Sequence, residues 1–112
     1  MSYEKNVGIS LLLDFYGQML TDKQRETAEL YYNEDLSLAE VSKITGVTRQ
    51  GVRDRLVKAE AILCDYEEKL GLLARFTAMK NEIADIASLL RRRENGENVD
   101  IEELINRLKA LQ

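Results

Sequence analysis

Apolar residues recur at steps of three and four along nearly the whole of this 112-residue chain, and no proline interrupts them. Such spacing places the apolar side chains on one face of an α-helix, whereas a half-buried strand would carry one at every second position. No segment of the sequence alternates in the second way. The chain is therefore predicted to fold as an all-α protein.

Polar residues and glycines mark where the expected helices begin and end. Thr21 and Ser37 each stand three residues before Gln24 or Glu40, which is the spacing of a capping box at a helix start. Gly46 suits the left-handed position just past a helix end. We expect a first helix within residues 9–20, followed by helices over residues 22–32, 38–45, 49–70, 73–93 and 101–111, the last capped by Asp100.

The stretch from Ser37 to Leu56 has the pattern of a helix-turn-helix. Gly46 allows the tight turn, Val47 follows it as an apolar plug, and Thr48 can cap the second helix. The inner faces of these two helices are predicted to be Leu38, Val41, Ile44, Val52 and Leu56. The first two helices of the chain are predicted to bury Ile9, Leu12, Leu13, Tyr16, Leu20, Thr27, Ala28 and Tyr31, with Leu30 as a further candidate.

Histidine is absent and Cys64 is the only cysteine. These two facts exclude a Ser-His-Asp triad, a histidine-containing zinc site and an internal disulfide. No convergent set of titratable groups stands out, so we predict neither an enzyme nor a metal or cofactor site. A lone thiol fits a reducing, cytoplasmic compartment. The chain has no run of 18 apolar residues, so no membrane insertion is expected.

Charge is unevenly distributed along the chain, whose net charge is −4. Residues 1–35 carry three bases and seven acids, and residues 64–112 carry eight bases and ten acids. Residues 36–63 carry five bases and three acids, so only the stretch that holds the helix-turn-helix is basic. An acidic chain is a poor non-specific coat for nucleic acid, but one short basic helix leaves site-specific binding open.

The second helix of the helix-turn-helix begins with side chains that suit DNA. Its N-terminal end is the part that enters a major groove, where arginine pairs with guanine and glutamine with adenine. The same geometry also packs in proteins that never touch DNA, so the pattern alone leaves a protein partner open. The predicted DNA-binding residues are Arg49, Gln50 and Arg53 at base edges, Lys43, Arg55 and Lys58 at phosphates, and Thr48 at the helix start.

Several co-linear segments carry a resemblance to known proteins. Leu20–Arg25, Leu36–Val41 and Gly46–Arg53 resemble region four of bacterial sigma factors, which reads a promoter hexamer. Residues 9–75 are more closely similar to the YlxM (p13-like) family of small bacterial helix-turn-helix proteins, through Phe15-Tyr16-Gly17 and Thr48-Arg49-Gln50-Gly51-Val52 among others. The resemblance implies a sigma-region-four fold without a wing, with a long recognition helix and a C-terminal helical extension.

The same resemblance implies two alternative roles. One is a regulatory protein that binds DNA through its helix-turn-helix and takes part in the signal recognition particle pathway. The other is a protein-binding adaptor or regulator of the signal recognition particle's GTPase that does not touch DNA. In both roles the protein is not an enzyme.

Two positions depart from the sigma-factor pattern. Gly51 stands where a sigma recognition helix usually carries an arginine, and Asp54 stands where a glutamine is usual. Losing one bidentate base contact costs about 1–3 kcal/mol of discrimination, and the carboxylate of Asp54 would repel phosphates. We therefore expect weak DNA binding by a monomer, which a homodimer would offset by engaging two half-sites.

Residues 72–112 are expected to form a helical hairpin beside a helix-turn-helix domain of residues 1–71, with the joint at Gly71. Its first helix carries a coiled-coil-like seam, which packs either on the last helix or on a second copy of the chain. The length of this tail favours a homodimer. The seam consists of Phe76, Met79, Ile83, Ile86 and Leu90.

Overall fold

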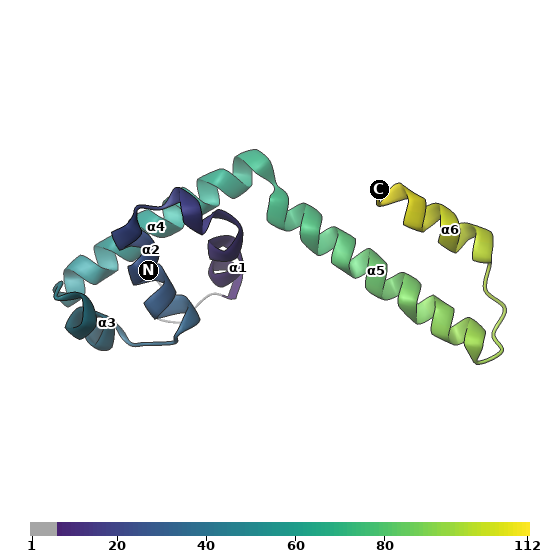
Figure 1. Ribbon diagram of the computed structural model, residues 1–112, viewed down its shortest axis with the longest axis horizontal. Helices are drawn as coiled ribbons and strands as arrows, with labels where there is room; N and C mark the ends of the chain where they lie inside the picture. Colours follow the sequence, from purple (N-terminus) through teal and green to yellow (C-terminus); the bar gives the residue numbers. More distant parts are fainter. Residues whose placement is uncertain (1–6) are drawn as a thin grey trace. The chain divides into compact units, whose positions relative to one another are not determined.

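The computed structural model describes residues 7–112, and every regular element within that range is helical. The all-α prediction is therefore confirmed. None of the described helices has the length and apolar composition that crossing a membrane requires. Figure 1 shows the helices α1 (Val7–Tyr16), α2 (Asp22–Ala28), α3 (Leu38–Thr45), α4 (Arg49–Leu70), α5 (Leu72–Glu94) and α6 (Ile101–Ala110).

The predicted helix starts and stops are confirmed by their hydrogen bonds. Thr21 Oγ1 accepts from the Gln24 amide at 3.2 Å, and Gln24 Oε1 accepts from the Thr21 amide at 3.0 Å. Ser37 and Glu40 form the same reciprocal pair at the start of α3. Gly46 has a φ of 76°, the left-handed conformation that ends α3 at little cost because glycine has no Cβ.

Two short elements differ from the regular helices that the spacing predicts. A 3-10 turn, η1 (Gly17–Met19), follows α1, and a π-helical turn, η2 (Glu29–Asn33), follows α2. In η2 the Glu34 amide donates to the Glu29 carbonyl at 3.0 Å, one residue further back than in an α-helix.

The described residues form two compact units that divide after Leu73. In the first unit, apolar side chains of α1, α2, η2, α3 and α4 make one core. The positions predicted to be buried on the first two helices are buried there, except that the further candidate Leu30 is only partly buried. The core consists of Ile9, Leu12, Leu13, Tyr16, Leu20, Ala28, Tyr31, Val41, Val52, Leu56, Ala59 and Leu63.

The prediction that Ile44 belongs to this core is wrong. Its side chain is 57% exposed, whereas Val41 is fully buried and Leu38 is half-buried. Three residues turn an α-helix by about 300°. The step from Val41 to Ile44 therefore carries the side chain further from Leu38 and past the edge of the buried face.

The second unit, residues 74–112, contains most of α5 and all of α6. Asn95 and Gly96 make the predicted turn, and Gly96 has a φ of 91°. Asp100 caps α6 as predicted, accepting from the Glu102 amide at 3.0 Å and the Glu103 amide at 3.4 Å. The helix α6 then runs back alongside α5 (Figure 1).

Candidate nucleic-acid interface

The turn between α3 and α4 is held in place by side chains of α3. Ser42 Oγ donates to the Val47 carbonyl at 2.5 Å, and Thr45 Oγ1 accepts a longer hydrogen bond, 3.4 Å, from the Val47 amide. Thr48 then caps α4 by accepting from the Gly51 amide at 3.0 Å. These contacts fix the direction in which α4 leaves the turn.

The start of α4 is also held by contacts on its buried side. Val52 and Leu56 are fully buried against the first-unit core, together with Val41 of α3. Tyr32 of η2 donates a hydrogen bond to the Glu60 carboxylate on α4. Burial of the Tyr32 hydroxyl raises its pKa, and the hydrogen bond to Glu60 raises it further, so this tyrosine stays protonated. The first turns of α4 are therefore a rigid platform for exposed side chains.

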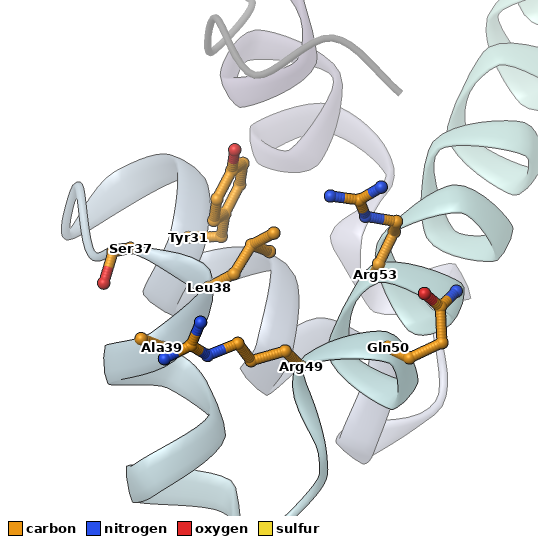
Figure 2. A pocket seen from close by; sticks show the side chains of 7 residues that line it. All are labelled: Tyr31, Ser37, Leu38, Ala39, Arg49, Gln50 and Arg53. Carbon is orange, nitrogen blue, oxygen red and sulfur yellow. The ribbon is translucent and has the colours of Figure 1, made fainter.

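The three predicted base-reading residues come together at this platform. Arg49, Gln50 and Arg53 line one concavity of about 520 Å³ between the beginnings of α3 and α4. In Figure 2 the guanidinium of Arg49 extends toward Ala39 of α3, and that of Arg53 points toward Tyr31. The two arginines thus place positive charge on one side of the helix start.

Gln50 forms a hydrogen bond with Asp54, one of the two residues that depart from the sigma-factor pattern. Its Nε2 donates to Asp54 Oδ1 at 2.9 Å, a contact between residues one turn apart on α4. Both side chains are exposed. The surface at the start of α4 therefore combines the exposed Arg49 and the partly buried Arg53 with an amide and a carboxylate.

The other predicted DNA-binding residues do not line this concavity. Lys43 lies exposed in the last turn of α3, and Lys58 lies exposed on α4 beyond Asp54. Arg55 is half-buried on another side of α4, where its Nη1 lies 3.5 Å from Thr27 Oγ1 of α2. Thr48 is exposed and acts as the N-cap described above.

The walls of the concavity include residues outside the predicted DNA-binding set. Tyr31 comes from η2, and Ser37, Leu38 and Ala39 come from the first turn of α3. The positive end of the α3 dipole faces this side of the molecule, because the helix begins there. The capping box at Ser37 gave the position of this helix start, but not its distance from α4.

The comparison with known proteins agrees with this arrangement. The family described as "Putative helix-turn-helix protein, YlxM / p13 like" matches residues 3–105. The chain belongs to this family. The predicted resemblance is thereby confirmed, and the match extends through α5 into α6, beyond the segments from which the resemblance was drawn.

Relatives in several bacteria share most of the chain. The UPF0122 protein of Desulforamulus reducens is 47% identical over 89 residues, which are 80% of this chain and 76% of that protein. The relative in Thermoanaerobacter sp. strain X514 is 43% identical over 92% of each chain. The relative in Limosilactobacillus reuteri is 39% identical over 100% of this chain and 98% of its own. The family is described by a helix-turn-helix and not by an enzymatic activity.

Proposed function

We propose that this protein is a DNA-binding regulator that inserts the start of α4 into a major groove. The observation that carries the proposal is the grouping of Arg49, Gln50 and Arg53 around one concavity at the beginning of that helix. This is the end of a recognition helix that reaches base edges. Membership of a helix-turn-helix family supports DNA as the ligand.

The side chains at the start of α4 would contact different bases. Arg49 and Arg53 offer the planar donors that pair with the O6 and N7 atoms of guanine. Gln50 gives one amide hydrogen to Asp54, which leaves its second amide hydrogen and its carbonyl oxygen for an adenine. The Asp54 carboxylate can accept from the amino group of cytosine and repels phosphates, so it favours sequence discrimination over affinity.

Contacts to phosphates come from outside this face. Lys43 and Lys58 are exposed on α3 and α4, and both are long enough to reach a sugar-phosphate backbone. Arg55 instead braces α4 against Thr27 of α2, so its substitution acts through the orientation of α4.

A fluorescence-anisotropy titration at two salt concentrations tests the proposal, with DNA fragments selected from genomic DNA by the wild-type protein. The double variant Arg49→Ala, Arg53→Ala is expected to bind at least tenfold more weakly, because each lost arginine contact costs about 1–3 kcal/mol. The wild-type affinity is expected to fall steeply with salt.

The matched control is the double variant Arg91→Ala, Arg93→Ala, which removes two arginines from the last turn of α5 and changes the net charge equally. It is expected to bind within a few-fold of the wild type. Equal losses in the two double variants would mean that only net charge matters. An unchanged affinity of the Arg49→Ala, Arg53→Ala variant would exclude direct readout by α4.

A protein-binding adaptor is the second candidate, and the exposed Asp54 on the recognition face favours it. A carboxylate at that place and a net charge of −4 suit a basic protein surface better than a phosphate backbone. The family resemblance points to the GTPase of the signal recognition particle as the partner. If the protein is such an adaptor, it is expected to retain the purified GTPase and to show no salt-sensitive affinity for DNA. Failure of the immobilised protein to retain the GTPase would reject it.

A further inference from the structure

The hairpin of residues 74–112 has a very small core of its own. Within this fully described stretch only Ile86 and Leu104 are buried, each 2% exposed. Arg107 of α6 makes salt bridges to Glu82 and, at 2.6 Å, to Asp85 of α5, which hold the two helices together. A unit of about 40 residues with so little core generally needs a disulfide, a metal or a partner. The hairpin contains no cysteine.

Both helices of the hairpin expose large apolar side chains. Those on α5 recur at the steps of three and four that keep them in one stripe. Each of them is about half exposed, and contiguous exposed apolar surface of this kind marks an interaction site. The exposed residues are Phe76, Met79, Ile83 and Leu90 on α5 and Ile105 and Leu108 on α6.

Helix geometry places the two sets on the same side of the hairpin. Glu82 of α5 and the buried Leu104 of α6 belong to the contact between the helices. Ile83 directly follows Glu82, and Ile105 directly follows Leu104. In each helix this step of one residue rotates the side chain about the helix axis by about 100°. Because α6 runs back alongside α5 (Figure 1), equal turns bring both side chains to one face.

The spacing on α5 is self-complementary about Ile83. Phe76 and Leu90 lie seven residues before and after it, and both are about half exposed. A two-fold axis through Ile83 would therefore set Phe76 against Leu90 of an antiparallel second helix. A surface that matches itself after such a rotation is what an isologous dimer requires.

Charge also favours a second copy as the occupant. Residues 74–112 carry seven bases and seven acids, so 7 − 7 gives a net charge of zero, whereas the whole chain has −4. Two hairpins can therefore approach without net repulsion, and the residues of the exposed stripe are themselves uncharged.

We propose that this apolar face binds the same face of a second copy, so that two hairpins form an antiparallel four-helix bundle centred on Ile83. The contact supplies the apolar burial that one hairpin lacks. It is independent of the proposed DNA binding, and it gives each assembly two helix-turn-helix units.

Sedimentation velocity from micromolar to millimolar concentration tests the contact. The wild type is expected to sediment with the mass of two chains and Ile83→Glu with the mass of one, because a charge would be buried at the centre of the bundle. The control Asn81→Glu adds the same charge to an exposed residue on the opposite side of α5 and is expected to remain dimeric. Circular dichroism checks that both variants keep their helices. A monomeric wild type, or a dimeric Ile83→Glu, would overturn the proposal.

Disulfide trapping tests the antiparallel arrangement, in a Cys64→Ser background because Cys64 is exposed. Ile83→Cys is expected to cross-link with itself on oxidation, since the two copies meet on the axis. Phe76→Cys is expected to cross-link only when mixed with Leu90→Cys. Self-cross-linking of Phe76→Cys as efficient as that of Ile83→Cys would show a parallel arrangement and overturn the proposed one.

Discussion

Gly51 departs from the sigma-factor pattern, and its surroundings explain why no side chain stands there. A Cβ added to Gly51 would lie 2.5 Å from Cγ1 of Val47 and 3.2 Å from Oγ1 of Thr48. Val47 is the half-buried residue that plugs the turn, and its β-branched side chain has few rotamers to choose from. The missing arginine is therefore a consequence of how this turn packs.

The variant Gly51→Ala is expected to lower the free energy of unfolding by about 1 kcal/mol. Alanine is better than glycine inside a helix by about 1 kcal/mol, but overpacking against Val47 costs about 1–3 kcal/mol. Urea unfolding measures the difference.

The control for this substitution is the same change in a Val47→Ala background, where Cγ1 of Val47 is gone. There Gly51→Ala is expected to stabilise the protein, because only the helix preference remains. Stabilisation in both backgrounds would contradict the packing explanation.

The candidate site could be predicted residue by residue only where the information is local. Arg49, Gln50 and Arg53 follow from their distance to the cap at Thr48, because a helix fixes which side chains its first turns expose. The contact of Arg55 with Thr27 could not be predicted, since it joins residues 28 positions apart. That Tyr31 also lines the concavity could not be predicted, because this depends on how η2 packs beside α3 and α4.

At the scale of the elements, the start of α5 is held by side chains from α1 and α4. Tyr16 Oη donates to Glu67 Oε1 at 2.7 Å and accepts from the Leu72 amide at 3.1 Å. Glu67 Oε1 also accepts from the Leu73 amide at 2.9 Å. These contacts satisfy two of the amide groups that a helix start leaves without intrahelical partners.

The variant Tyr16→Phe is expected to lower stability at neutral pH by about 1–2 kcal/mol, because a buried network loses its hydroxyl. It is also expected to change the response to alkali. Burial raises the pKa of the Tyr16 hydroxyl, and the hydrogen bond to Glu67 raises it further. The unfolded chain, with a tyrosine pKa of about 10, then loses this proton first as the pH rises. Wild-type stability should therefore fall above about pH 10, toward the higher folded pKa.

Urea unfolding between about pH 7 and 11 checks this expectation, because Tyr16→Phe lacks the titrating group and should give a flatter profile over the alkaline part. Other alkaline groups are common to both proteins, so the comparison isolates Tyr16. Parallel profiles for the two proteins would show that Tyr16 is not the coupled group.

The beginnings and ends of the helices could be predicted because capping is local. Thr21, Ser37, Thr48 and Asp100 each bond to amides two or three residues ahead. The exposure of Ile44 was mispredicted because an apolar residue in the last turn of a short helix can lie on either side of its buried face. Its sequence neighbours do not decide which.

At the scale of the whole molecule, charge and apolar surface are assigned to different parts of the chain. The basic stretch, residues 36–63, holds the helix-turn-helix, and the uncharged stripe lies within residues 74–112. The acidic balance elsewhere opposes non-specific binding to nucleic acid. The proposed DNA binding therefore depends on specific contacts at the start of α4.

The coiled-coil-like seam shows how far periodicity alone can be used. It correctly predicts which α5 residues share a stripe. It does not distinguish a stripe covered by α6 from one left for a second chain, because both give the same spacing. In the structure Ile86 is the one seam residue that is buried, and the other four are about half exposed.

The central claim is that the start of α4 is the surface that reads DNA. An NMR titration of isotope-labelled protein with the selected DNA tests it most directly, because each backbone amide reports its own environment. We predict chemical-shift changes concentrated at residues 37–39 and 48–54, with few in residues 74–112. Changes confined to residues 74–112, or none under conditions where anisotropy reports binding, would contradict the claim.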